Sequence, residues 1–146
     1  MTPRSVIDAV VADLQAAGFT YGGSHQPAKA PGTVSGSFTV LDNGNVDTGR
    51  LNRAGLMRIS VGFIVELTHR MGSKQKARAI QQATADIAKV IRTLLSPTAT
   101  VKTEGGAVYY EGTSAPVDGG GGTHQLRQVV FRVEGNMSLE TTDGEA

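Results

Sequence analysis

The side chains best suited to acid–base chemistry or to transition-metal binding are three histidines, His25, His69 and His124. They are far apart in the sequence, and no G-x-S-x-G motif supplies a serine nucleophile that one of them would activate. His69 ends an alternating apolar segment beside Arg70, so we expect it at the surface, at the end of a strand. The pattern predicts neither a catalytic base nor a histidine metal site, and we expect a protein that is not an enzyme.

The carboxylates and glycines do not match a known metal or phosphate site either. Asp42, Asn45 and Asp47 are wrongly spaced for an EF-hand loop, and no glutamate follows them. The glycine run that ends at Gly122 lacks the Lys-Ser or Lys-Thr of a P-loop and precedes a predicted strand rather than a helix. There is no cysteine, which excludes disulfides, thiolate catalysis and cysteine-bound metal centres. We therefore predict no catalytic residue, no cofactor and no metal.

Basic residues gather where the central strand meets the following helix, and two more lie in a polar segment before that strand. The residues of this predicted interaction surface are Arg50, Arg53, Arg70, Lys74, Lys76 and Arg78. The net charge is only +1 and no aromatic residue lies within the basic cluster, so we expect no sequence-specific nucleic-acid binding. Acidic residues dominate the last part of the chain, and this separation of charge suits contacts between copies. A solvated helix face and an acidic tail explain the same pattern more simply.

The strongest structural signal is a strand followed by a helix in the middle of the chain. Every odd-numbered residue from Met57 to Leu67 is apolar, which predicts a long antiparallel strand with one covered face. Ser73 is the predicted N-cap of the helix, and apolar residues recur at helical spacing from Ile80 to Leu95. A proline two residues further on ends the pattern. This unit predicts a helix that lies across one face of a sheet.

The rest of the chain supplies the other elements of that sheet and its helical layer. The predicted elements are a helix at 3–17, strands at 33–41 and 124–134, and two short strands within 98–111. The segments predicted to lack regular structure are a protruding arm at 42–55, a flexible loop at 112–123 and a frayed acidic end at 138–146. Together they predict an α+β fold, with a mostly antiparallel sheet, two helices packed on one face, and long loop or hairpin arms.

Length and composition are consistent with one domain over residues 1–146. An apolar content of 39% is enough for a core, and no apolar run approaches the ~20 residues of a membrane-spanning helix. Asp8 and Asp13 interrupt the first apolar segment, which argues against a secretory signal. We therefore expect no membrane partner, and the lack of cysteine fits a cytosolic chain.

The order of these elements resembles that of the tail terminator (tail-completion) proteins of long-tailed bacteriophages. The similar segments are an N-terminal helix, the strands TVSGSFTVL and LMRISVGFIVEL joined by a polar arm, the break HRMGS, the helix AIQQATADIAKVIRTLL and the late strand QVVFRVEG. The resemblance is one of pattern and size over roughly residues 3–134. The acidic end and the four consecutive glycines are not features of that pattern.

The resemblance implies a structural role in the tail of a virion. It implies a homo-oligomer in the form of a hexameric ring that caps the tail tube, stops tube polymerisation and offers a joining surface to the head connector or neck protein. The partners would be further copies of the chain, the tail tube protein and the connector. Two alternatives stay open at this point, another neck or head-closure protein of a phage and a small-ligand-binding α+β domain.

Overall fold

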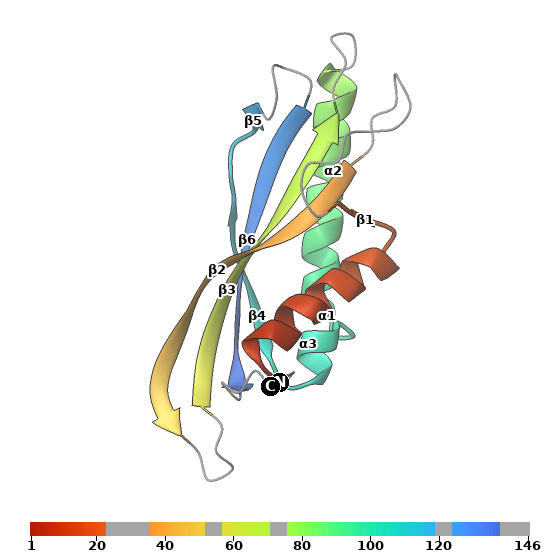
Figure 1. The fold of residues 1–146 in the computed structure, drawn as a ribbon. Coiled ribbons are helices and arrows are strands. Elements are labelled where there is room, and N and C mark those ends of the chain that lie inside the picture. The colour runs from red at the N-terminus through yellow and green to blue at the C-terminus, as the bar shows by residue number, and fades with distance from the viewer. Residues whose placement is uncertain (23–35, 52–56, 71–75, 119–123, 138–146) are drawn as a thin grey trace.

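A six-stranded, mostly antiparallel sheet forms one layer of the molecule, and helices cover one of its faces (Figure 1). The structure is a computed structural model that describes residues 1–22, 36–51, 57–70, 76–118 and 124–137. The side chains of 36, 45–51, 57, 70, 76–79 and 118 are outside this description. The predicted α+β class, with a mostly antiparallel sheet and two helices on one face, is confirmed.

The sheet has the strand order β1-β2-β3-β6-β4, and β5 pairs with β6 beyond the end of β4. The strands are β1 (Thr20–Tyr21), β2 (Gly36–Leu51), β3 (Met57–Arg70), β4 (Ala107–Thr113), β5 (Val117–Asp118) and β6 (His124–Met137). Only β1 and β2 run parallel. The central strands β3 and β6 pair without interruption from Met57 opposite Met137 to Arg70 opposite His124. This uninterrupted pairing fixes which side chains of both strands face the helices.

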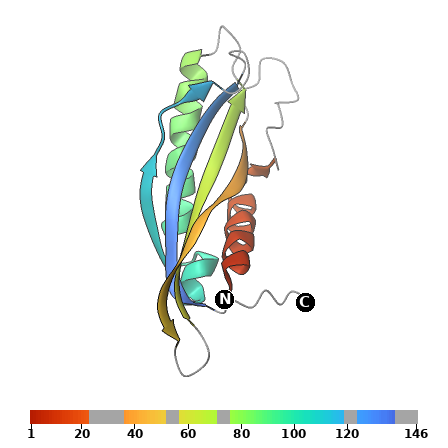
Figure 2. The same cartoon turned by 60° about the vertical axis from the view of Figure 1, so that its left-hand side comes forward.

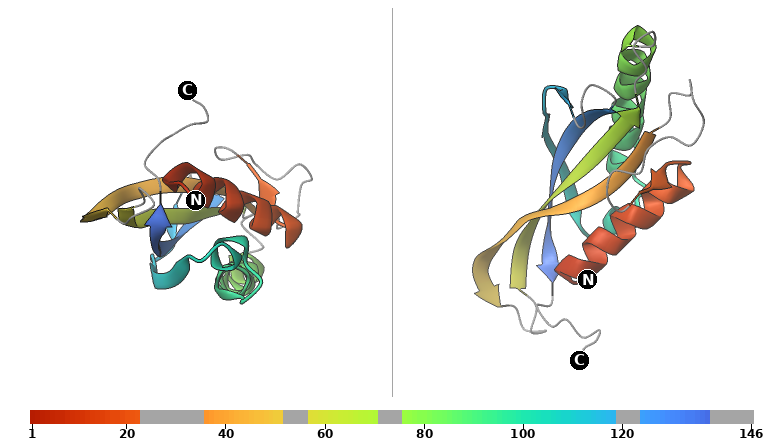
Figure 3. Two further views of the ribbon diagram at one scale, coloured as in Figure 1. Left: turned by 90° about the horizontal axis from the view of Figure 1, so that it is seen from below. Right: turned by 45° about the horizontal axis from the view of Figure 1, so that its top comes forward.

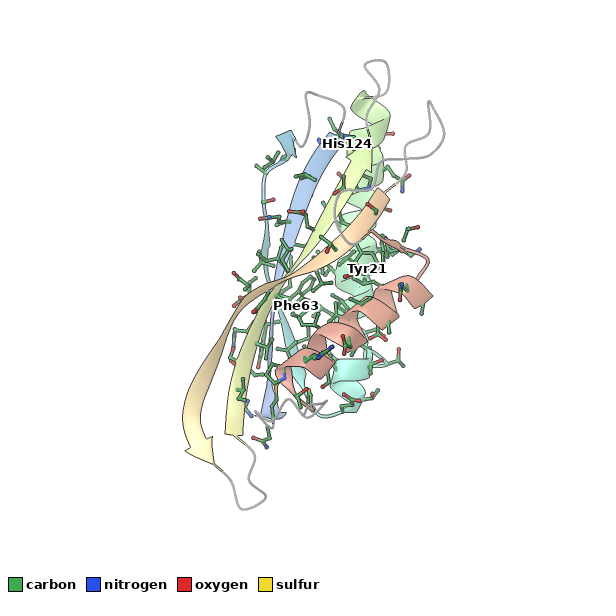
Figure 4. All side chains as sticks on the ribbon, in the orientation of Figure 1. Tyr21, Phe63 and His124 are labelled. Atoms are coloured by element: carbon green, nitrogen blue, oxygen red, sulfur yellow. The ribbon has the colours of Figure 1, made fainter. Side chains whose placement is uncertain are left out.

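The predicted alternation of β3 is confirmed. Its described odd-numbered apolar residues, from Ile59 to Leu67, are at most 1% exposed. Opposite them on β6, Val129, Phe131 and Val133 are buried in the same layer, and Phe63 stacks on Phe131 with ring centroids 5.4 Å apart. Phe63 lies at the centre of the side chains between the sheet and the helices (Figure 4). The alternation of apolar and polar residues in the sequence thus places the apolar side chains in one continuous layer.

Two long helices supply the other half of the core and run obliquely to each other (Figure 3). The first, α1 (Pro3–Ala16), begins with a capping box between Thr2 and Ser5. The chain leaves this helix at Gly18, whose φ of 101° is readily adopted by glycine. The second is α2 (Lys76–Leu95). The residues that the two helices bury are Val6, Val10 and Leu14 of α1, and Ala83, Ile87, Val90 and Leu94 of α2. The predicted cap Ser73 lies outside the described residues.

The polar segment 42–55 is not the loop that its composition predicted. Its described part, to Leu51, continues β2, and Leu51 pairs with Met57 of β3. A bulge at Asn43 and Gly44 faces the single residue Gly62, and Gly44 has φ 89°. A side chain at position 62 would come within 3.0 Å of the Asn43 carbonyl oxygen. Pairing with β3 therefore outweighs the low strand propensity of the Asn, Asp and Gly residues.

The far end of the β2–β3 hairpin extends beyond the helices α1 and α3 (Thr100–Thr103), as Figures 1 and 2 show. The described part of the predicted arm is therefore an extension of the sheet, in which β3 pairs with β2 on one side and with β6 on the other. Residues 52–56 of the predicted arm are outside the described part of the chain.

The prediction of the first of two short strands within 98–111 is wrong. Residues Thr100–Thr103 form a one-turn helix, α3, whereas the second predicted strand is present as β4. Both carboxylate oxygens of Asp13 in α1 accept hydrogen bonds from Thr100, one from its backbone N–H at 2.9 Å and one from its hydroxyl at 2.7 Å. A carboxylate from a distant helix thus caps α3.

The predicted loop at 112–123 is also partly regular structure. Its first two residues belong to β4, and Val117–Asp118 form β5. Its run of four glycines lies outside the described ranges, as does the predicted acidic end at 138–146.

Candidate interaction surface

The face of the sheet opposite the helices carries mostly polar side chains with one apolar row. That row crosses three strands, because Leu41 pairs with Ile64 and Ile64 pairs with Val130. No described helix packs on this face, and Leu41 at its margin is 37% exposed. We call this side of the sheet the uncovered face. It combines apolar contact area with polar surroundings, which is typical of surfaces that bind other proteins.

A cluster of charged and aromatic side chains lies on the uncovered face where β4 meets β6. The guanidinium of Arg132 lies 4.6 Å from the centre of the Tyr109 ring, and its Nε donates to Glu111 Oε2 at 3.0 Å. Arg132 also pairs with Glu134, which in turn lies 3.5 Å from Arg58. These ion pairs are partly exposed, so each contributes at most about 1 kcal/mol to stability. The tyrosine and arginine are the residue types that dominate the binding energy of protein interfaces.

Another acidic residue of the uncovered face, Glu66, is buried and forms a hydrogen bond within the sheet. Glu66 is 7% exposed, and its Oε2 accepts a hydrogen bond of 3.0 Å from Gln128 Nε2 on β6. The two residues are direct cross-strand neighbours in the register of β3 and β6. Glu66 therefore holds two central strands together and does not present a free carboxylate to a substrate.

His69 is buried, and the expectation that it lies at the surface is wrong. It occupies an odd position of β3, so it faces the helices, and it has no exposed surface. Its Nε2 lies 2.6 Å from Asp86 Oδ2 of α2, and Gln82 donates to the other Asp86 oxygen at 2.9 Å. This arrangement resembles part of a catalytic dyad, but a histidine without solvent access has no contact with a substrate. The pair fastens α2 to the end of β3.

An open groove of about 400 Å³ lies where α1 and α2 end and α3 begins. Its residues are mostly small or hydroxylic, with Asp13 and Arg92 as the charged members. Both oxygens of Asp13 are occupied by Thr100, so the groove lacks a free carboxylate. It offers shape but no converging polar groups of the kind that define a small-molecule site.

The described backbone places four of the six predicted basic residues at two opposite ends of the sheet. Arg50 stands near the end of β2 at the extended hairpin, whereas Arg70 ends β3 at the opposite end of the sheet. Lys76 and Arg78 lie in the first turn of α2, which follows that end of β3. The side chains of these four residues are outside the described part of the structure, and Arg53 and Lys74 lie in undescribed segments. Among the described residues of the predicted surface, Arg70, Lys76 and Arg78 share the end of the sheet where β3 is followed by α2.

The Tyr109–Arg132 cluster was missed by sequence analysis because no local pattern joins its members. Tyr109 and Arg132 become neighbours only through the pairing of β4 with β6. The available signal was the exposed pair Tyr109-Tyr110 within a short strand, which is typical of a sheet edge. The described residues contain no group of three or more His, Cys, Asp or Glu residues placed to hold a metal ion.

Comparison with known proteins gives no relative of this chain. No model of a protein family matches the sequence, and a search of curated proteins finds no match either. Among the described helices, none is long and apolar enough to cross a membrane.

Proposed function

We propose that this chain is a structural protein of a phage virion, whose copies join into a ring that caps the tail tube. In this role the ring ends polymerisation of the tube and provides the surface to which the head connector or neck protein binds. A hexamer is the proposed state, and the ring is assembled in the host cytoplasm before it becomes part of the tail. The chain supplies binding surfaces in this function, and we assign it no catalytic step.

The observation that carries the proposal is the uncovered face with its Tyr109–Arg132 cluster. One face of the sheet is sealed by the helices, and the other presents exposed tyrosine, arginine and an apolar row. Such residues are enriched at the centre of protein interfaces, where burial from water strengthens their contacts. An assembly protein needs surfaces of this kind, because its function is to bind copies and partners.

The extended hairpin supports the same role. Beyond the helices, β3 pairs with β2 on one side and with β6 on the other, and the outer edge of β2 has no described neighbour there. The order of elements also agrees with the resemblance to tail terminators, from α1 through the β2–β3 hairpin and α2 to the late strand β6. A rigid core that carries a projecting hairpin is suited to reach a neighbouring subunit or the end of a tube.

The size of the purified protein in solution tests the ring. Light scattering and native mass spectrometry are expected to show a species of six times the 15.2 kDa chain mass, and electron microscopy to show an annulus. Arg132→Ala should weaken this assembly, because it removes the centre of the cluster. Thr98→Ala, an exposed change on the helical side, is the matched control and should leave assembly unchanged. A protein that stays monomeric up to its solubility limit contradicts the proposal.

A second assay separates the tail end from other joints of the virion. Purified rings added to polymerising tail tube protein are expected to stop tube growth and to appear at one end of each tube. Tubes that continue to grow in the presence of intact rings would assign the ring to a different joint, such as the neck.

A further inference from the structure

In the part of the chain that the structure describes, the sheet has an edge without a partner strand on each side. On one side, β1 pairs only with Ser37 and Phe38, so no described strand covers β2 from Thr39 onward. On the other side, β4 pairs only with β6, and its central residues 109–111 are exposed on both faces of the sheet. Exposed strand edges present unpaired backbone N–H and C=O groups, which bind any other strand that fits them.

The hydrogen-bonding groups at the β2 edge belong to Val40 and Asp42. The Phe38 carbonyl accepts from the Gly22 N–H on the β1 side at 2.8 Å, so the backbone groups of Phe38 point outward, away from β3. Both backbone groups of a strand residue point to the same side, and the side alternates along the strand. The pairing of β2 with β3 is regular from Phe38 to Asp42, so Val40 and Asp42 also point outward.

The corresponding groups at the β4 edge belong to Val108 and Tyr110. The Ser114 N–H donates to the Gln128 carbonyl at 2.8 Å, so the even-numbered residues of β6 direct their backbone groups toward β4. Arg132 is one of these residues and is paired with Tyr109, which therefore bonds inward to β6. The neighbours Val108 and Tyr110 consequently point outward, to the free edge.

We propose that residues 40–42 of β2 pair with residues 108–110 of β4 in a second copy of the chain, as an antiparallel continuation of the sheet. The inference rests on the proposed ring and names the contact that would build it. β4 runs opposite to β2, because β2 and β6 share a direction and β4 is antiparallel to β6. A copy placed beside the first with the same faces up therefore brings β2 next to β4 in the antiparallel sense.

One register satisfies both the hydrogen bonds and the side chains. Val40 opposite Tyr110 joins two residues whose backbone groups both point outward, and Asp42 opposite Val108 does the same. Leu41 then lies opposite Tyr109, and both belong to the uncovered face. Tyr109 and Tyr110 are 42% and 41% exposed in the single chain, and this register covers them with Leu41 and Val40. Cross-strand pairs of an aromatic with an aliphatic residue stabilise sheets.

A second copy fits these edges better than an unrelated extended peptide does. Both halves of the contact are present in every chain, and they lie on opposite sides of one sheet, so each copy binds two neighbours. Such a head-to-tail contact closes into a ring when the rotation between copies divides a full turn, which the twist of the sheet makes possible. A peptide that binds one edge would leave the other edge exposed.

Engineered cysteines test the register, because the natural chain has none. In the double variant Leu41→Cys/Tyr109→Cys, the two thiols of adjacent copies face each other in a non-hydrogen-bonded pair, with Cα atoms roughly 4.5 Å apart, a spacing that a disulfide bridges. Within one chain the two positions are three strand spacings apart, roughly 14 Å, which no disulfide spans. Mild oxidation should therefore give a ladder of covalent multimers on a non-reducing gel, ending at the ring size.

The single variants are the matched controls. Leu41→Cys and Tyr109→Cys alone should remain unlinked, and an oxidised mixture of the two should give a dimer and nothing larger. A linked Leu41→Cys dimer would indicate a two-fold contact and would refute both the head-to-tail pairing and the ring built from it. If the double variant forms no disulfide although light scattering still shows the mass of a ring, the edge contact is refuted and the ring is not. A protein that is monomeric in every assay would overturn the proposed function together with this contact.

A backbone substitution provides a second measurement. Tyr110→Pro removes an N–H that points away from β6, so it spares the β4–β6 hydrogen bonds. Tyr110→Ala is its control, because it shortens the same side chain and keeps the N–H. Assembly of the proline variant is expected to be roughly fivefold weaker than that of the alanine variant. Equal assembly of the two variants would show that this N–H takes no part in the contact.

Discussion

Replacing Asp86 with alanine removes the described hydrogen-bond partner of His69 Nε2. The His69 side chain has no exposed surface, so water cannot replace the lost partner. A buried donor or acceptor left without a partner costs about 1–3 kcal/mol. The His69–Asp86 distance of 2.6 Å and the full burial of the histidine favour the upper half of that range. Alanine is the better helix former by up to about 0.7 kcal/mol, which offsets part of the loss. We expect Asp86→Ala to lower the free energy of unfolding by about 2 kcal/mol.

Urea denaturation followed by circular dichroism measures this loss, and the thermal midpoint should fall by about 4–8 °C in a chain of this size. Gln82→Ala is the control, because Gln82 bonds the same carboxylate from an exposed position and its removal should cost no more than about 0.5 kcal/mol. The double variant His69→Leu/Asp86→Ala should lose clearly less unfolding free energy than the sum of the losses in the two single variants. Additive losses, or an Asp86→Ala loss as small as that of Gln82→Ala, would refute a buried pair that fastens α2 to β3.

Three further changes probe other parts of the fold. Val61→Asp places an unpaired charge among fully buried side chains and should cost several kcal/mol, so soluble, folded protein from this variant would contradict the assigned face of β3. Gly62→Ala presses a methyl group against the Asn43 carbonyl at 3.0 Å and should lower the unfolding free energy by about 1–2 kcal/mol, measured by urea titration; an unchanged midpoint would mean that the bulge moves freely. Asp13→Ala removes both hydrogen bonds from Thr100 and should raise the rate of amide hydrogen exchange in α3 more than in β3. An equal increase in both elements would contradict the role of Asp13 as the cap of α3.

The parts of the fold that sequence predicted are those in which local pattern and final environment agree. The odd-numbered apolar residues of β3 predicted its covered face because alternation directly records which side of a strand is buried. The helix predicted at 3–17 is present as α1 for the same reason, since its apolar residues recur at helical spacing and its capping box joins residues three positions apart. Such features depend on neighbours in the sequence.

The parts that were missed depend on contacts between distant residues. β2 continues through Asn43 and Gly44 because β3 supplies the pairing, although these residue types favour turns. Thr100 begins a helix because Asp13, far back in the chain, binds its N–H and hydroxyl. His69 looked like a surface residue because its partner Asp86 comes from the next helix. The candidate interaction cluster belongs to this second class, since only strand pairing brings its residues together.

The position of β6 between β3 and β4 has a consequence for how the protein is made. β6 is the last of the described strands in sequence order, yet it lies between β3 and β4 in the sheet and is the one described strand that pairs with β4. On the ribosome, the β2–β3 hairpin emerges first and can form locally, whereas β3 pairs with β6 only after Met137 has been synthesised. Until β6 has been synthesised, β4 has no partner among the described strands, so the sheet lacks its second edge. Nascent chains without β6 therefore lack one of the two edges that the proposed contact between copies requires.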